Sequence, residues 1–224
     1  MYKIELHLHT KYSSGCGQLD EKELISGYKA AGYSAIVVTD HYNRDTFRMK
    51  NIDPDDSCDR LTPYLEGYYK VKAEGEKQGI RVYRGAELRF DENQNDYLFF
   101  GWSDDLLADP GKVFRMTPME FANYHRPTGS IMIQAHPFRW MCSPADPAAL
   151  DGVEIRNMHP GHDSRNHLAS EMAEQNPQLI CTGGSDTHET IHMCRGGIIA
   201  EYLPENEEEL VALLKSGRYT IIGE

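Results

Sequence analysis

Residues 3–10 read K-I-E-L-H-L-H-T and set two histidines at the end of a short apolar run. Side chains alternate between the two faces of an extended strand, so His7 and His9 project together. Leu6 and Leu8 then project to the opposite side, toward the layer between strands and helices. Neutral imidazole is a common ligand for zinc, iron and similar ions. The segment therefore predicts a strand that begins a metal site, unless both histidines merely end the strand in water.

The composition of the 224 residues is that of an ordinary globular protein, and the length predicts one domain over residues 1–224. No apolar run is long enough to span a bilayer, and the first residues lack the pattern of a signal peptide. The five cysteines are scattered without a C-x-x-C pair, which favours a reducing compartment. These features predict a cytoplasmic protein with no membrane partner.

The net charge of −12 argues against a nucleic-acid partner, because nucleic-acid binding relies on basic surface that neutralises phosphates. A small phosphorylated substrate remains compatible with this charge, since bound metal ions can invert the local field. The sequence leaves the oligomeric state open.

Strand-like and helix-like segments alternate, which is typical of an α/β protein with a mainly parallel sheet. The expected strands cover residues 3–8, 35–39, 81–87, 97–102, 130–135, 153–155, 179–182, 197–200 and 220–222. The expected helices run from Asp20 to Gly32, over 60–78, from Thr117, over 162–174 and from Asn206 to Gly217. Capping boxes at D-E-K-E and T-P-M-E mark two helix starts. Residues 42–60 predict an irregular loop, and seven or eight strand-helix units favour a barrel.

Ionisable residues gather at the carboxyl ends of the expected strands. The residues that share this position are His7, His9, Asp40, His41, Glu87, His136, Glu154, Asn157, Asp186 and His188. Barrels and open α/β sheets place their active sites at these ends. We therefore predict one metal site, with ligands His7, His9, His41, Glu87, His136, Asp186 and His188.

The number of these ligands exceeds what one ion needs, so two or three divalent ions are expected. A carboxylate such as Glu87 can bridge two ions. Ions about 3.5–4 Å apart can activate a bridging water and stabilise the oxygens of an in-line phosphoryl displacement. Imidazole and carboxylate ligands suit zinc, iron or manganese and do not select among them.

Five motifs, H-L-H-T, V-T-D-H, G-A-E, A-H-P and G-S-D-T-H, occur in this order between residues 3 and 199. As a set they resemble the motifs of the polymerase and histidinol phosphatase (PHP) superfamily of metal-dependent phosphoesterases. The resemblance implies a distorted (β/α)7 barrel, TIM-like, with a two- or three-metal cluster at the carboxyl face of its strands.

The resemblance also implies a division of the ligands among the ions. His7, His9, Glu87 and Asp186 would hold the first ion, and Glu87 would bridge it to a second ion that His136 also holds. His41 and His188 would hold a third. Glu87 and Asp186 would thereby be catalytic as well as ligating residues.

The sequence departs from the family pattern at two places. Ser14 stands where many members have a carboxylate ligand, so Cys16 or water would complete the third ion, unless Cys16 is structural. No histidine follows the strand at 97–102, which reads G-W-S-D instead and predicts weaker binding of the second ion. Trp102 and Trp140 either wall a substrate pocket or pack in the core or a lid.

Several residues near the motifs suit a phosphorylated substrate. Arg139 and Arg195 can grip phosphate with a bidentate guanidinium, although each can instead form an ordinary ion pair. Asn157 is a further candidate for substrate binding. His159 or His162 can protonate a leaving group, or both are solvated loop residues. The remaining histidines are expected outside the site: His167 and His192 at the surface and His125 in the last turn of a helix.

The pattern predicts an enzyme that hydrolyses a small phosphorylated metabolite or nucleotide through a metal-activated water. One alternative is an amidohydrolase-type metal hydrolase, which usually needs a lysine at a later strand end, and no lysine occupies those ends. Another alternative is a metal-binding regulatory domain with degraded catalysis, to which Ser14 and the missing histidine lend weight.

Overall fold

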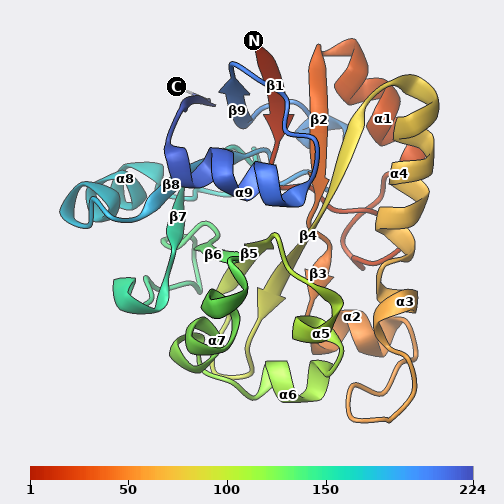
Figure 1. Cartoon of the computed structure of the whole chain (residues 1–224), viewed down its shortest axis with the longest axis vertical. Coiled ribbons are helices and arrows are strands. Elements are labelled where there is room, and N and C mark those ends of the chain that lie inside the picture. Colours follow the sequence, from red (N-terminus) through yellow and green to blue (C-terminus); the bar gives the residue numbers. More distant parts are fainter. Residues whose placement is uncertain (224) are drawn as a thin grey trace.

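The computed structural model describes residues 1–223, and its strands form one curved, nearly closed sheet (Figure 1). The strand order is β10-β9-β1-β2-β4-β5-β6-β7-β8, and β3 pairs with β4. The strands are β1 (Tyr2–Glu5), β2 (Tyr33–Val38), β3 (His41–Tyr42), β4 (Arg81–Arg89), β5 (Asp96–Phe100), β6 (Ile131–Gln134), β7 (Gly152–Asn157), β8 (Ile180–Gly184), β9 (Gly197–Ala200) and β10 (Tyr219–Ile222). Of the nine strands on the path, β5 and β9 run antiparallel to their neighbours and the remaining seven share one direction. This architecture confirms the distorted (β/α)7 barrel.

The two edges of the sheet meet where β8 lies against β9 and β10. The hydroxyl of Tyr219 on β10 donates to the carbonyl of Cys181 on β8 over 2.7 Å. A parallel bridge joins Leu8 to Thr187, just beyond the ends of β1 and β8. The H-L-H-T and G-S-D-T-H motifs, far apart in the sequence, are therefore neighbours in space.

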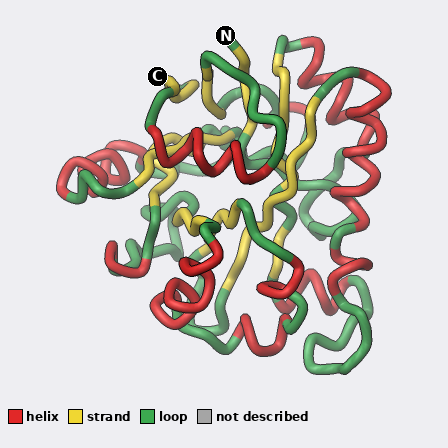
Figure 2. The backbone as a smooth tube through the Cα atoms, in the orientation of Figure 1, coloured by secondary structure: helices red, strands yellow, loops and turns green. Residues whose placement is uncertain are grey.

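Helices lie outside the strands, with α1 and α4 packed together along one side of the sheet (Figure 2). They are α1 (Glu21–Ala30), α2 (Arg44–Met49), α3 (Leu61–Tyr64), α4 (Glu66–Gln78), α5 (Asp104–Leu107), α6 (Pro110–Phe114), α7 (Pro118–His125), α8 (Asn166–Gln175) and α9 (Glu207–Ser216). Both predicted capping boxes form, Asp20 with Glu23 and Thr117 with Glu120. Gly79 ends α4 with a φ of 75°, a left-handed conformation that glycine adopts freely.

Some predicted boundaries are wrong. β1 ends at Glu5 instead of residue 8, and the helix expected over 60–78 is broken at Leu65 into α3 and α4. Residues 42–60 are not all irregular, because they include α2. The side chain of Asn43 caps the start of this helix. α8 begins only at Asn166, since Arg165 before it adopts a left-handed φ of 48°.

The strand alternation expected for Leu6 and Leu8 does not hold. Both are fully buried, but Leu8 packs in the cluster that includes Leu24 and Tyr28 of α1. Leu6 packs with Ile4 in a second apolar cluster. This cluster is made of residues from one face of the strands and from the buried side of α9. The expectation that both leucines face the strand-helix layer is therefore wrong for Leu6, because regular strand geometry stops at Glu5.

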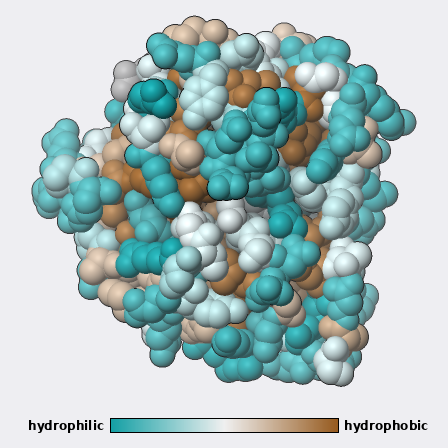
Figure 3. Space-filling model, in the orientation of Figure 1, coloured by the Kyte–Doolittle hydropathy of each residue, from teal (hydrophilic) through white to brown (hydrophobic). Residues whose placement is uncertain are grey.

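Hydrophilic residues cover most of the face seen in Figure 3, with apolar residues showing between them. Among residues 1–223, no helix combines the length and the apolar character that crossing a membrane requires.

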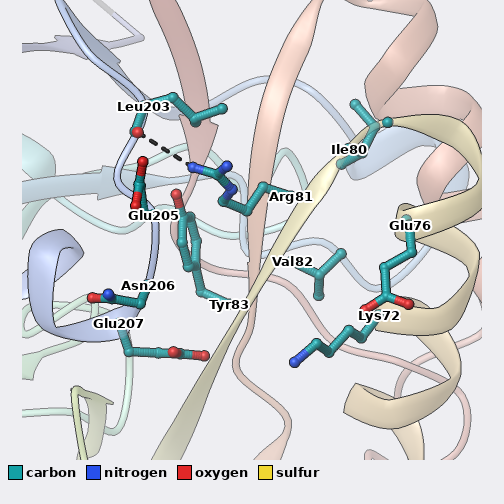
Figure 4. A pocket seen from close by; sticks show the side chains of 12 residues that line it. Lys72, Glu76, Ile80, Arg81, Val82, Tyr83, Leu203, Glu205, Asn206 and Glu207 are labelled. Carbon is teal, nitrogen blue, oxygen red and sulfur yellow. Dashed lines mark hydrogen bonds between the residues drawn. The ribbon is translucent and has the colours of Figure 1, made fainter.

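A hollow of about 470 Å³ opens beside the amino end of β4, between this strand, α4 and the start of α9 (Figure 4). Arg81, the first residue of β4, donates from Nη1 to the carbonyl of Leu203 over 3.3 Å. The hollow is thus at the opposite end of β4 from Glu87. Barrels place their active sites at the carboxyl ends of their strands, so the hollow lies away from the end at which the expected ligands gather.

We expect Leu8→Ala to lower the free energy of unfolding by about 2–5 kcal/mol, because it leaves a cavity in a fully buried cluster. Metal content per folded molecule should stay unchanged. By contrast, His9→Ala should lose metal. Its free energy of unfolding should fall by little more than the contribution of the bound metal. Denaturant unfolding and metal analysis of both variants test this, and loss of metal in Leu8→Ala at unchanged stability would contradict it.

Candidate metal centre

Glu87, on β4, lies at the centre of the imidazoles. Its two carboxylate oxygens are buried and accept no hydrogen bond from the described chain. The surrounding nitrogens are His7 Nε2 at 3.2 Å and His136 Nε2 at 3.3 Å from Oε1, and His9 Nε2 at 3.4 Å and His41 Nδ1 at 2.7 Å from Oε2. The fold therefore brings together side chains that follow β1, β2 and β6 around one carboxylate of β4.

Asp186 completes a cage of four side chains with Glu87, His7 and His9, in which Glu87 faces His7 with Oε1 and His9 with Oε2. Its Oδ1 lies 3.4 Å from His7 Nε2 and 3.5 Å from His9 Nε2. With the two contacts to Glu87, four edges of the cage measure 3.2–3.5 Å. Ligands about 2.0–2.1 Å from a tetrahedral ion stand about 3.3–3.4 Å apart, whereas charge-assisted hydrogen bonds are about 2.7–2.9 Å long. The spacing fits a shared ion better than direct hydrogen bonds.

The imidazole nitrogens that face the cage also lack partners. Nε2 of His7, Nε2 of His9 and Nδ1 of His41 are buried and form no hydrogen bond with residues 1–223. Burying such groups without partners is costly in free energy, and a cation among them would remove that cost. The groups of possible ligands around Glu87 and His9 are His7–Glu87–His136, His7–His9–Asp186, His9–His41–His188 and His41–Glu87–Asp96, and a fifth group, His159–His188–His192, adjoins them. These residues fit a centre of divalent metal ions.

Polar groups behind the imidazoles fix which ring nitrogen faces the cage. Glu154, buried on β7, accepts a hydrogen bond of 2.9 Å from Nδ1 of His7. Nδ1 of His188 donates to the carbonyl of Asp186 over 2.9 Å. A neutral imidazole carries one proton, so a proton held at Nδ1 leaves the lone pair of Nε2 free for a metal.

Ser14 plays the same part for His9. Its hydroxyl oxygen accepts from His9 Nδ1 over 3.2 Å and from the backbone N–H of His41 over 2.9 Å, and it donates to Asp40 over 2.8 Å. The hydroxyl is fully used within this network. Ser14 therefore orients the ligand His9 and is not itself a ligand.

Glu5 connects the segment that follows β1 with the segment that follows β8, and both segments carry predicted metal ligands. Its carboxylate accepts the backbone N–H groups of Leu6, His7 and Ser185 at 3.0, 3.0 and 2.9 Å, and the hydroxyl of Tyr28 at 3.0 Å. The sequence gives no signal for this role of Glu5. It places Glu154 at the carboxyl end of an expected strand but does not show that Glu154 holds His7. Contacts between strands distant in the chain cannot be read from local pattern.

The charges in the cage shift one another's pKa values. Burial alone would lower the pKa of His7, but the carboxylates of Asp186, Glu154 and Glu87 raise it well above its usual value. Burial would raise the pKa of Glu87, yet His7 and His41 hold it well below its usual range. Without a metal, protons on the imidazoles supply the positive charge that the buried carboxylates need.

Arg139 and Asn157, predicted to bind substrate, both hold Asp186. Nη2 of Arg139 donates to Asp186 Oδ2 over 2.6 Å and to Asn157 Oδ1 over 2.8 Å. The amide of Asn157 donates to the same Asp186 oxygen over 3.2 Å. Nε of Arg139 is buried without a partner in the described chain, so this guanidinium retains a free donor.

The predicted proton donors lie beside His188. The ring centroid of His159 is 5.5 Å from that of His188 and 4.6 Å from that of His162, which is exposed. His192 is not a surface residue as expected, because it is 8% exposed and its ring centroid lies 4.1 Å from that of His159. Arg195 is exposed, and its Nε donates to the carbonyl of Ile191 over 2.9 Å.

The antiparallel direction of β5 corrects one expectation. Arg89 at the carboxyl end of β4 pairs with Asp96, the first residue of β5, whereas the last residue of β5 pairs with Gly85. Residues 101–104 therefore follow β5 away from the metal centre, and the missing histidine there removes nothing from it. Trp102 is buried and stacks on Phe99, so it does not wall the site.

The structure bears out some of the other expectations for single residues and corrects others. Trp140 is 79% exposed and packs in no core. His125 does lie at the end of α7, but it is fully buried between Phe99 and Phe121. His167 is exposed, as expected.

Cys16 lies beside the group His9–His41–His188. Burial alone would raise the pKa of its thiol, but the imidazoles of His188 and His41 lower that pKa to about 6. A thiol with this pKa has thiolate character near neutral pH, and thiolate is the form that binds metals.

A family model, the PHP domain, matches residues 5–221 of the chain. The chain belongs to the PHP family. The five motifs named above lie at the carboxyl face of this PHP barrel. No curated protein matches the chain in sequence.

Solved structures share the fold of this PHP barrel at low sequence identity. PsfC from Pseudomonas syringae superposes with a TM-score of 0.71 at 17% identity, over 100% of this chain and 91% of PsfC. A two-domain protein from Bacteroides vulgatus, containing a predicted PHP-like metal-dependent phosphoesterase, gives 0.70 at 16% identity, over 100% of this chain and 65% of that one. The lesion-specific endonuclease EndoQ from Pyrococcus furiosus gives 0.64 at 16% identity, over 98% of this chain and 57% of that one.

We expect metal uptake by this PHP barrel to release protons. Burial and Arg139 lower the pKa of His136, but Cys142 and Glu87 outweigh them and raise it to about 9 in the metal-free protein. Below pH 9 a metal must displace the proton, so metal affinity should rise with pH up to about 9.

Titration with zinc in weakly buffered solution containing a pH indicator measures the release. His136→Asn should release fewer protons per ion than the parent protein. Uptake without proton release between pH 6 and 8 would contradict the prediction.

Proposed function

We propose that this protein is a metal-dependent phosphoesterase that hydrolyses a small phosphorylated metabolite or nucleotide. The observation that carries the proposal is the cage around Glu87, whose ligand atoms are spaced for shared ions at the carboxyl face of the barrel. Ions bound there would supply a water of lowered pKa and neutralise charge on the phosphoryl oxygens. The donor set suits zinc, manganese or iron.

The spacing supports a division of the ligands among three ions. His7, His9, Glu87 and Asp186 would hold the first. Glu87, which also contacts His136, would share the second ion with it, and His41 and His188 would hold the third. Glu87 and Asp186 are proposed to be catalytic through the ions that they position.

The side chains around the ions would bind and orient the substrate. Arg139, whose side chain is 15% exposed, would meet a phosphoryl oxygen with its guanidinium, and Asn157 keeps that guanidinium in place. Arg195 is exposed beside His192 and is free to meet a charged group at the rim. His162, exposed and packed on His159, is placed to exchange protons with water and with a leaving group.

A small substrate is favoured over a nucleic acid. One structural relative is an endonuclease, but only the fold is shared at 16% identity. The net charge of −12 would repel an extended phosphate backbone. The amidohydrolase alternative has less support, because no lysine follows the carboxyl ends of β6, β7 and β8 in the sequence, where that class usually carries one.

Turnover of a generic aryl phosphate by zinc-, manganese- or iron-loaded protein tests the proposal. Glu87→Gln should reduce turnover at least about 100-fold and lower metal content, because an amide has one oxygen and no charge with which to bridge cations. Glu208→Gln, on the exposed face of α9, is the matched control and should behave like the parent. Full turnover in folded Glu87→Gln protein would refute the bridging role, and absence of turnover with every ion and ester would favour the regulatory alternative.

We also propose that Cys16 completes the ligands of the third ion, in the place of the carboxylate that the family pattern has near Ser14. Cobalt(II) reports a bound thiolate through sulfur-to-cobalt charge-transfer absorption in the near ultraviolet. This absorption should appear in the parent and in Cys58→Ser, an exposed control, and be lost in Cys16→Ser. If Cys16→Ser keeps the same spectrum, Cys16 is not a ligand.

A further inference from the structure

Two large apolar residues in succession, Trp140 and Met141, are exposed on the loop that follows β6. Trp140 leaves 79% of its surface in water. The second tryptophan of the chain, Trp102, is by contrast buried, with its ring stacked on Phe99. Burying apolar surface is favourable, and aromatic rings carry more of that surface than most side chains. The packing of the fold therefore makes no use of the indole of Trp140.

The backbone that carries Trp140 is held by two successive turns. The N–H of Arg139 donates to the carbonyl of His136 over 3.0 Å, and the N–H of Cys142 donates to the carbonyl of Arg139 over 2.8 Å. Met141, the third residue of the second turn, has a φ of 72°, a conformation for which glycine is usual at this position. A residue other than glycine keeps such a conformation where surrounding contacts enforce it. The turn at Trp140 thus has a fixed shape.

Both ends of this pair of turns are attached to the metal centre. The first turn begins at His136, whose Nε2 lies 3.3 Å from Oε1 of Glu87. The residue before Trp140 is Arg139, whose Nη2 donates to Oδ2 of Asp186 over 2.6 Å. The backbone of Trp140 is therefore fixed in position beside the predicted ligands.

The exposure of the ligands shows where the centre opens to solvent. The side chain of Glu87 is buried, whereas those of His41 and His188 are 17% and 15% exposed. The side chain of Arg139 is partly exposed as well. A phosphoryl group bound to ions at Glu87 would direct the organic group that it esterifies toward this opening. Trp140 follows Arg139 directly, so its indole is the first large apolar surface beyond that guanidinium along the chain.

We propose that Trp140 is a specificity-determining residue that stacks on a flat aromatic ring in the organic group of the substrate, as in a nucleoside monophosphate. The inference rests on the proposed phosphoesterase function. Stacking suits this chain because a neutral aromatic ring is not repelled by the net charge of −12. A preformed turn also reduces the cost of ordering the contact when the substrate binds.

The fluorescence of Trp140 in zinc-loaded protein tests the contact without turnover. Trp102→Phe leaves Trp140 as the only tryptophan. The first probe is the phosphonate analogue of adenosine monophosphate, in which a CH₂ group replaces the ester oxygen, and the second is the same phosphonate of ribose without the base. The adenosine analogue should quench the emission of Trp140, and the ribose analogue should leave it unchanged. If Trp102→Phe does not fold, the difference in emission between the parent and Trp140→Phe gives the same readout.

Substitution of Trp140 measures the contribution of stacking to affinity. Trp140→Ala should weaken binding of the adenosine analogue about tenfold or more in calorimetry and leave that of the ribose analogue unchanged. Trp140→Phe keeps an aromatic ring and should retain most of the affinity. Tyr202→Ala is the control, because Tyr202 is exposed and follows β9, whose last residue, Ala200, pairs with Tyr2 at the amino end of β1.

Equal affinities for the two analogues in the parent would overturn the proposal, as would an affinity that Trp140→Ala leaves unchanged or lowers equally for both. A dimeric parent that dissociates in Trp140→Ala would also overturn it, since a second copy would then cover the indole. Quenching that depends on the base, without hydrolysis of any ester by zinc-, manganese- or iron-loaded protein, would refute the phosphoesterase proposal alone. Hydrolysis with affinity independent of Trp140 would refute this one alone.

Discussion

The buried carboxylate of Glu87 is the constraint on which the rest of the structure depends. Four imidazoles face its two oxygens, and no hydrogen bond from the described chain satisfies them. A buried anion of this kind is stable only if positive charge is supplied beside it. Protons on the histidines can supply it, but the cage spacing of 3.2–3.5 Å is that of ligands around ions. Because metals would bind the folded cage and not the unfolded chain, metal loading and fold stability are coupled.

The residues that surround this charge are held in strained positions. Asp186 has a φ of 52° and His136 a φ of 29°, in the left-handed region that residues other than glycine seldom adopt. Such conformations persist where several contacts enforce them. Glu5 fixes the backbone of Ser185 next to Asp186, and Glu154 accepts the backbone N–H of His136 over 3.1 Å. The strained backbones thereby aim His136 at Glu87, and Asp186 at His7 and His9.

The two antiparallel strands decide which residues reach the centre. Since β5 runs against β4, its first residue, Asp96, comes within reach of His41 and Glu87, where Arg89 pairs with it at 2.7 Å. The segment after β5 lies instead at the end of the barrel that α9 covers. The residues that line the hollow in Figure 4 belong to this same end and have no part in the proposed chemistry.

The family, the helix caps and the side chains that meet at Glu87 could all be predicted from the sequence. Capping depends on residues three apart, and the ligands follow parallel strands whose carboxyl ends must converge, so short-range pattern carries both. Features that depend on strands from distant parts of the chain became visible only in the folded molecule. The contact of His7 with Glu154 spans 147 residues, and the burial of His192 against His159 depends on two loops that follow different strands. The separation of Leu6 from Leu8 belongs here too, because it arises just past Glu5, where the regular pairing of β1 ends.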